Sequence, residues 1–177
     1  MDASAEIKKR EALFNLAKEI GANSDCWLFP TEKEVRGFLG TDSIVIVGDQ
    51  PSKSPWDESH PHRRIYYDTL KKVGASNVHL TDLYKRRGEP SSLKNLLPHQ
   101  FPKDFPEHLK FFRREIEILK PTRVVALGML AYKLLRVYVP ELNQDLGQMW
   151  HFSYVWQSGK SHLYEAHMKR AIWKIQF

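Results

Sequence analysis

The fold of this chain is decided by the stretch Ile44-Val45-Ile46-Val47-Gly48-Asp49-Gln50-Pro51-Ser52, in which an apolar run stops at a glycine and a carboxylate follows. Four consecutive β-branched residues between Asp42-Ser43 and Gly48 are typical of a central strand buried on both faces, as in parallel sheets covered by helices. The carboxyl end of such a strand is the usual place for a ligand crevice. We therefore expect the chemistry of this protein at Asp49 and the residues that follow it.

Other segments of the chain alternate between strand and helix patterns. Further strands are predicted at Val78–Thr81, at Thr122–Leu127 and, as a strand end, at Trp150–Val155. Apolar residues at helical spacing predict helices over 5–20, 31–38, 65–73, 109–119, 128–139 and 163–173. Residues 83–103 contain three prolines and little periodicity. They are expected to form a long loop, and loops of that length in small domains are often functional.

This alternation predicts an α/β fold, a three-layer α/β/α sandwich with a central, mainly parallel sheet of about four strands. The chain has 177 residues, of which 42% are apolar. That length suits one buried core and is short for two. We expect a single domain over residues 1–177, with residues 1–40 as a helical amino-terminal extension packed on it.

Composition argues against a membrane protein. No apolar stretch approaches the roughly 20 residues that a membrane helix needs. The segment Met1–Glu6 is neither basic nor followed by an apolar core, so no signal peptide is expected. We expect a cytoplasmic protein, or a nuclear one if the source is eukaryotic.

Several kinds of site are excluded by the residues available. Cys26 is the only cysteine, which excludes an internal disulfide, a four-cysteine iron–sulfur cluster and a thiolate zinc site. The chain lacks the glycine-rich dinucleotide and phosphate loops, the Gly-x-Ser-x-Gly elbow and the His-Glu-x-x-His pair. His60 and His62 have only Asp57 and Glu58 as neighbouring metal ligands. We expect no metal and no cofactor.

Positive charge is concentrated in two segments. The formal net charge is +6, and residues 83–94 and 160–177 each carry four basic residues against one acid. Both segments follow a predicted strand end. Such patches suit a polyanion such as DNA or RNA, and ordinary solvated surfaces are equally compatible with them.

Polar side chains follow three of the predicted strands. They are Asp49, Gln50 and Ser52 after the first, Asp82 and Lys85 after the second, and His151 and Ser153 in the last. The carboxyl ends of parallel strands meet at one edge of a sheet, so these groups should converge. Two carboxylates and an imidazole in one cleft are suited to cleaving a glycosidic bond.

Four motifs in order give the chain a resemblance to the uracil-DNA glycosylase superfamily over roughly residues 40–175. They are Gly48–Ser52, Val78–Lys85, Leu119–Gly128 and His151–Tyr154. They are similar to that superfamily's Gly-acid-x-Pro loop, Thr-Asn-x-x-Lys strand end, Lys-Pro-x-x-Val-x-x-Leu-Gly strand and His-Pro-Ser loop. The resemblance implies a monofunctional DNA glycosylase of base excision repair. Such an enzyme flips a damaged or unusual base and hydrolyses its N-glycosidic bond. It would act as a monomer on duplex or single-stranded DNA, without a cofactor.

The resemblance also assigns roles. Asp49 would activate water or stabilise the oxocarbenium-like sugar, and His151 would stabilise negative charge on the leaving base. Base-binding candidates are Gln50, Asp82, Trp56 and Tyr66, with His60 a further candidate for the ring that stacks on the base. DNA-binding candidates are Pro51, Ser52, Lys85, Arg86, Arg87, Ser153, Tyr154 and Lys160. Tyr154, Val155 or Trp156 would be the wedge that fills the vacated stack.

The chain departs from the superfamily pattern at two positions. Phe152 replaces the proline of the last motif. Asp82 stands where uracil-excising relatives have an asparagine, and an ionised carboxylate only accepts hydrogen bonds. An exocyclic amino group, or a protonated Asp82, would fit better. We therefore predict that uracil is not the best substrate.

Other interpretations remain open. Asp49 and Asp82 are residues that commonly cap turns, His151 is compatible with a hydrogen-bonded structural histidine, and residues 85–87 with solvent-facing charges. The whole chain is also compatible with a catalytically silent module that binds nucleic acid or protein, or with an enzyme of free nucleosides or nucleotides.

Overall fold

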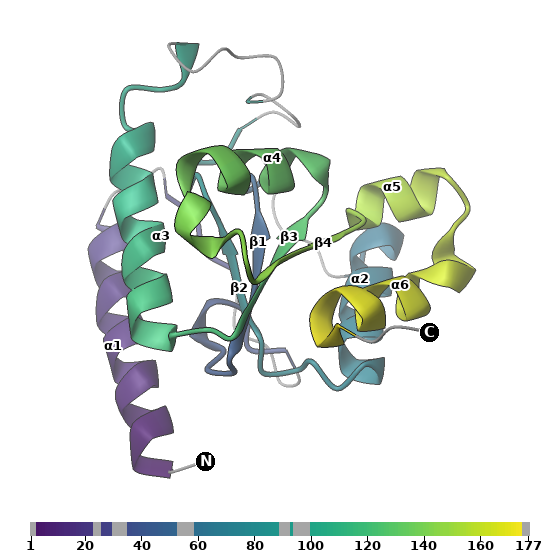
Figure 1. Cartoon of the computed structure of the whole chain (residues 1–177), viewed down its shortest axis with the longest axis horizontal. Coiled ribbons are helices and arrows are strands. Elements are labelled where there is room, and N and C mark those ends of the chain that lie inside the picture. The colour runs from purple at the N-terminus through teal and green to yellow at the C-terminus, as the bar shows by residue number, and fades with distance from the viewer. Residues whose placement is uncertain are drawn as a thin grey trace.

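A parallel four-stranded sheet of order β2-β1-β3-β4 lies at the centre of the protein (Figure 1). The structure is a computed structural model that describes residues 3–22, 26–29, 35–52, 59–88, 93 and 100–174. The strands are β1 (Ile44–Gly48), β2 (His79–Asp82), β3 (Arg123–Leu127) and β4 (Leu146–Met149). The predicted α/β class with a parallel four-stranded sheet is confirmed.

Helices cover both faces of this sheet (Figure 1). One face packs against α1 (Ala3–Gly21), α3 (Phe105–Leu119) and α4 (Met129–Tyr138). The other packs against α2 (Pro61–Lys72), α5 (Phe152–Gln157) and α6 (Ser161–Trp173). Short 3-10 turns lie at η1 (Gly37–Leu39) and η3 (Pro140–Leu142). None of the described helices is long and apolar enough to cross a membrane.

The β-branched run forms the centre of the core, as predicted. All five residues of β1 are buried. Val45 and Val47 pack on the α1–α3–α4 side, whereas Ile44 and Ile46 pack on the α2–α5–α6 side. Because successive side chains of a strand point to opposite faces, a strand between two helical layers must be apolar at every position.

The strand order determines where a ligand crevice can form. From β1 the chain passes through α2 to β2 on one side, then through α3 back to β3 on the other side. The connection that leaves β1 runs toward β2, whereas the connection that leaves the neighbouring β3 runs through α4 toward β4, in the opposite direction. A crevice is favoured where such connections part, at the carboxyl ends of β1 and its neighbours.

The predicted helices are observed with small shifts of their ends. Helices α2 and α3 begin about one turn earlier than their apolar spacing indicates, because Pro61 and Pro106 occupy their first turns. Proline fits there, since the first N–H groups of a helix have no partner within it. Of the helix predicted over 31–38, residues 31–34 lie outside the described residues, and 37–39 form η1.

The strand end predicted at Trp150–Val155 is wrong. The strand is β4, which ends at Met149, and residues 152–157 form α5. The imidazole of His151 accepts a hydrogen bond from the Ser153 N–H (3.2 Å), which caps the first turn of this helix. Phe152 and Val155 then face the core three residues apart, which is the spacing of a helix and not of a strand.

Candidate active site

Asp49, Asp82 and His151 each lie at the carboxyl end of a strand, on one edge of the sheet. Asp49 follows β1, Asp82 ends β2 and His151 follows β4 by two residues. In the β1–β2 register Gly48 is the partner of Asp82. A Cβ atom on Gly48 would lie 2.1 Å from Asp82 Oδ1. Because residue 48 is a glycine, the Asp82 carboxyl can lie over the end of β1, next to Asp49.

The surroundings of the Asp82 side chain favour its neutral form. Only 5% of the residue is exposed. Burial, the neighbouring Asp49 and, more weakly, Glu115 raise the pKa of Asp82 to about 8, while Lys85 acts in the opposite direction. A protonated carboxyl carries a hydrogen-bond donor as well as an acceptor, as an asparagine amide does.

Asp49 is ionised over most of the neutral range. Burial raises the pKa of Asp49 to about 6, and a hydrogen bond from its own main-chain N–H opposes this rise. Its carbonyl accepts the Tyr84 N–H at 3.0 Å, which ties this loop to the segment after β2. Two carboxyls with pKa values on opposite sides of pH 7 can serve as one base and one proton donor.

His151 is a neutral imidazole with a defined tautomer. Burial, with a smaller contribution from nearby His62, lowers the pKa of His151 to about 4. Because its Nδ1 accepts the Ser153 N–H, the proton of the neutral ring belongs on Nε2. Gly128 after β3 has φ +93°, and a Cβ there would lie 3.2 Å from His151 Cβ. The glycine therefore allows the histidine to approach the end of β3.

Phe152 is the centre of an aromatic cluster next to these groups. Its ring centroid lies 4.2 Å from that of His151, 5.3 Å from that of Tyr66 and 5.6 Å from that of His62. His60 in turn contacts His62, with ring centroids 3.9 Å apart. In place of the proline of the resembling motif, Phe152 thus builds a wall that joins α2 to α5.

Tyr66 does not fulfil its predicted role as a ring that stacks on a base. It is fully buried, and its ring packs against Phe152 and Tyr67. The hydroxyl has no hydrogen-bond partner among the described residues. Burial, with a smaller contribution from Asp82, raises the pKa of Tyr66. The hydroxyl therefore lies within electrostatic reach of Asp82, although its ring is inaccessible. Trp56, the other predicted ring, lies outside the described residues.

Lys85 is not a surface cation, so its predicted contact with DNA is wrong. Its side chain is fully buried, and Nζ lies 2.5 Å from Oε1 of Glu115, which is also fully buried. A phosphate cannot approach an ammonium group enclosed in this way. The charge of Lys85, which was expected in a loop, therefore lies in the interior of the protein.

The other candidates of the first two motifs lie together. Pro51 and Ser52 run beside the 86–88 segment, since Ser52 forms a bridge with Gly88 and the Pro51 carbonyl accepts the Gly88 N–H at 3.2 Å. Arg86 pairs with Asp104 at 3.0 Å, and the Arg87 guanidinium lies 5.0 Å from the centroid of the Trp27 ring. Gln50, Arg86 and Arg87 are partly exposed.

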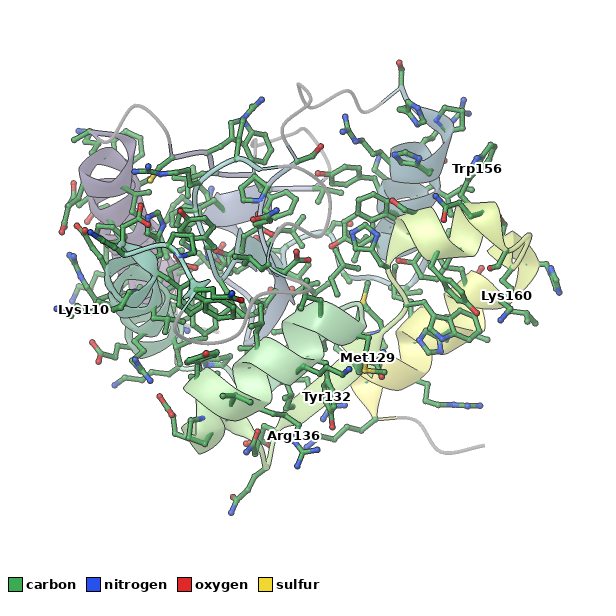
Figure 2. The ribbon with its side chains drawn as sticks, turned by 90° about the horizontal axis from the view of Figure 1, so that it is seen from above. Lys110, Met129, Tyr132, Arg136, Trp156 and Lys160 are labelled. Atoms are coloured by element: carbon green, nitrogen blue, oxygen red, sulfur yellow. The ribbon has the colours of Figure 1, made fainter. Side chains whose placement is uncertain are left out.

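The candidates of the last motif form a second group on α5 and the turn after it. Tyr154 and Trp156 are 45% and 48% exposed. Lys160 Nζ lies 2.5 Å from the Tyr154 hydroxyl and 5.2 Å from the centroid of the Trp150 ring. Figure 2 shows Trp156 on α5 and Lys160 at the α5–α6 turn. Ser153 contributes its main-chain N–H to His151, as described above.

Sequence reasoning named four residues that shape this site but assigned none of them a contact in it: Gly48, Gly128, His62 and Phe152. The two glycines each follow an apolar strand core, which is a usable signal for close approach of another group. His62 and Phe152 carry no comparable signal, because their importance depends on contact between α2 and α5.

A groove of about 520 Å³ lies away from these residues, between α1 and η1. Its walls include Ile7, Phe14 and Leu39, and none of the strand-end residues line it. In the part of the chain that the structure describes, no three His, Cys, Asp or Glu residues are arranged to hold a metal ion.

Comparison with known proteins does not identify the chain. No protein-family model matches it, and no curated protein matches it. Its function is therefore inferred from the geometry and chemistry of the strand-end site.

Proposed function

We propose that this protein is a DNA glycosylase of the uracil-DNA glycosylase superfamily type, which flips a damaged or unusual base and hydrolyses its N-glycosidic bond in base excision repair. One observation carries the proposal: Asp49, Asp82 and His151 lie at the carboxyl ends of β1, β2 and β4. Burial there raises the pKa of both carboxyls and lowers that of the imidazole. The motif order and the four-stranded parallel sheet between helices support it.

Asp49 acts on the sugar side of the reaction. When the bond between C1′ and the base breaks, its electron pair leaves with the base, and positive charge develops on the sugar. An ionised Asp49 stabilises that charge. Water then adds to C1′, and its proton passes to the Asp49 carboxylate, so the carboxylate serves as the general base.

His151 and Asp82 act on the base side. The Nε2–H of His151 donates to the carbonyl oxygen on which negative charge develops, which is stronger in the transition state than in the ground state. Protonated Asp82 offers a donor and an acceptor to the edge of the flipped base. Phe152 and His62 form the aromatic wall beside it.

The protonation state of Asp82 also sets the substrate preference. Below about pH 8 its carboxyl matches a lactam edge, with one N–H and one carbonyl, as found in uracil, hypoxanthine and xanthine. Above about pH 8 the carboxylate only accepts, and an exocyclic amino group fits better. The prediction that uracil is not the best substrate therefore applies to the ionised form of Asp82.

Two surfaces beside the site would contact DNA. Pro51, Ser52, Arg86 and Arg87 border Asp49 on one side. On α5, exposed Tyr154 and Trp156 are suited to enter the base stack that the flipped nucleotide leaves, with Lys160 beside them for a phosphate.

Alkali-induced strand cleavage tests the proposal. Duplex and single-stranded oligonucleotides with one uracil, hypoxanthine or xanthine are incubated with wild-type protein, Asp49→Asn or Asp145→Asn. Asp145 is the matched control, because it is exposed and directly precedes β4, at the end of the strands opposite to the candidate site. There it pairs with Lys174 at 3.2 Å. We expect wild-type protein and Asp145→Asn to excise at least one base.

The same experiment separates the enzyme from a silent module. Asp49→Asn should lose about 10²-fold or more in rate and retain DNA affinity, because the substitution removes the carboxylate that serves as general base and leaves the DNA contacts in place. Salt-sensitive DNA binding without excision by the wild-type protein would favour a silent nucleic-acid-binding module. Equal rates for wild type and Asp49→Asn would refute the role of Asp49.

A further inference from the structure

An ion pair is enclosed between the end of β2 and helix α3. The side chains of Lys85 and Glu115 are both 0% exposed, and their charged atoms lie 2.5 Å apart. The second carboxylate oxygen of Glu115 lies 3.3 Å from Nε2 of His79, which is also fully buried. Buried ion pairs rarely stabilise a fold more than apolar residues of the same size would. Packing alone therefore gives no reason for charge at this place.

The other contacts of Lys85 lead directly to the candidate active site. Its Nζ donates to Oγ1 of Thr81 at 2.5 Å and to the main-chain carbonyl of Asp82 at 2.6 Å. Its own main-chain N–H donates to Nδ1 of His108 on α3 at 2.9 Å. The lysine thus holds the last two residues of β2 while α3 holds the lysine at both ends.

We propose that Lys85 is a positioning residue of the candidate site, whose ammonium group, held by Glu115, fixes the Asp82 segment and keeps a positive charge behind its carboxyl. The catalytic importance of this role rests on the proposed function, in which Asp82 recognises the base. The contacts and charges that define the role of Lys85 do not depend on the proposed function.

The positive charge of Lys85 lowers the pKa of Asp82. The charged or titratable groups that face Asp82 are Asp49 after β1, Tyr66 on α2, Lys85 after β2 and Glu115 on α3. Among these, Lys85 favours the ionised carboxylate, whereas Asp49 and Glu115 oppose it. Loss of Lys85 together with Glu115 leaves burial and Asp49, which both favour the neutral acid.

The test is the carboxyl titration of Asp82, followed by carbon-13 NMR in the absence of DNA. The resonance is assigned by its disappearance in Asp82→Asn. In the double variant Lys85→Met/Glu115→Gln, both charges are removed, so that no uncompensated buried charge remains to unfold the protein. We expect the midpoint for Asp82 to rise by about one pH unit, because the charge of Lys85 acts on Asp82 more strongly than the opposing charge of Glu115 that is lost with it.

A matched control removes a second ion pair of α3. Arg114 and Glu19 pair at 2.5 Å on the exposed side of that helix. Arg114→Met/Glu19→Gln should leave the Asp82 midpoint unchanged, with a melting temperature close to that of the wild type. A purely structural role for Lys85 would change the melting temperature without moving the Asp82 titration. An unchanged midpoint in the folded Lys85→Met/Glu115→Gln variant overturns the proposal.

A measurement on wild-type protein keeps the proposal testable if the double variant does not fold. A buried ammonium group that is held by two hydrogen bonds and an ion pair exchanges its protons slowly, so its nitrogen-15 signal should be resolved at neutral pH. Rapid exchange of that signal with solvent would contradict the assigned contacts. Both NMR readouts are independent of excision. A protein without glycosylase activity can therefore confirm the role of Lys85, and an active one can refute it.

Discussion

Replacement of Asp82 by asparagine should stabilise the protein, because the native fold binds a proton there that the unfolded chain does not. Burial and Asp49 raise the pKa of Asp82 from 3.8 to about 8. Between these two pH values the folded state keeps the proton and the unfolded state releases it. The free energy of unfolding therefore falls as pH rises through this window.

The magnitude follows from the width of the window. Each pH unit above 3.8 costs about 1.4 kcal/mol of stability until the folded carboxyl also ionises. The accumulated cost is on the order of 2 kcal/mol at pH 5 and 4 kcal/mol at pH 7. An asparagine at this position would not titrate, so Asp82→Asn should exceed the wild type in unfolding free energy by about these amounts.

Urea unfolding of both proteins at pH 5, 6, 7 and 8 measures the difference, with equal m-values as the check on two-state behaviour. Asp145→Asn, at the end of the strands opposite to the candidate site, should stay within about 0.5 kcal/mol of the wild type throughout. A difference between wild type and Asp82→Asn that does not grow with pH would refute a protonated Asp82 in the native state.

Three other predictions concern excision. The value of kcat/KM should rise through about pH 6 as Asp49 ionises and fall through about pH 8 as Asp82 does; a flat profile between pH 5 and 9 would exclude this pair. His151→Ala should lower single-turnover rates by about 10²-fold or more while DNA affinity in a binding titration is retained; an equal loss in both would point to a structural role. Gly48→Ala should lower excision and shift the Asp82 titration, since a Cβ atom would lie 2.1 Å from its carboxyl; wild-type values for both measurements would show that the carboxyl is free to lie elsewhere.

The sequence was sufficient to predict β1 and the gathering of strand-end residues, because both follow from local patterns. An uninterrupted β-branched run requires burial on both faces, and parallel strands bring their carboxyl ends to one edge. Asp49 and Asp82 were found in this way, whereas His151 was expected within a strand and instead follows β4 by two residues. Helix α5 was missed because its aromatic and β-branched residues favour a strand. In the structure, the His151 ring caps its first turn, and burial of Phe152 and Val155 on one side stabilises the helix.

The environment of Lys85 and Asp82 was beyond sequence reasoning. The partner of Lys85 is Glu115, thirty residues further along the chain, and nothing in a basic loop indicates that one of its cations faces inward. The proton on Asp82 depends likewise on Asp49 and on burial of the carboxyl, which are properties of the assembled fold.

The cap of α5 gives His151 a structural role beside its proposed chemical one. Its Nδ1 starts the helix that carries Tyr154 and Trp156, and the same bond leaves the proton on Nε2. The helix has only six residues. A displacement of its exposed aromatic side chains would therefore also displace the imidazole at its amino end. In the proposed complex, a duplex that presses on Trp156 would also aim the proton donor. Grip on the substrate and readiness for chemistry would then be one mechanical event.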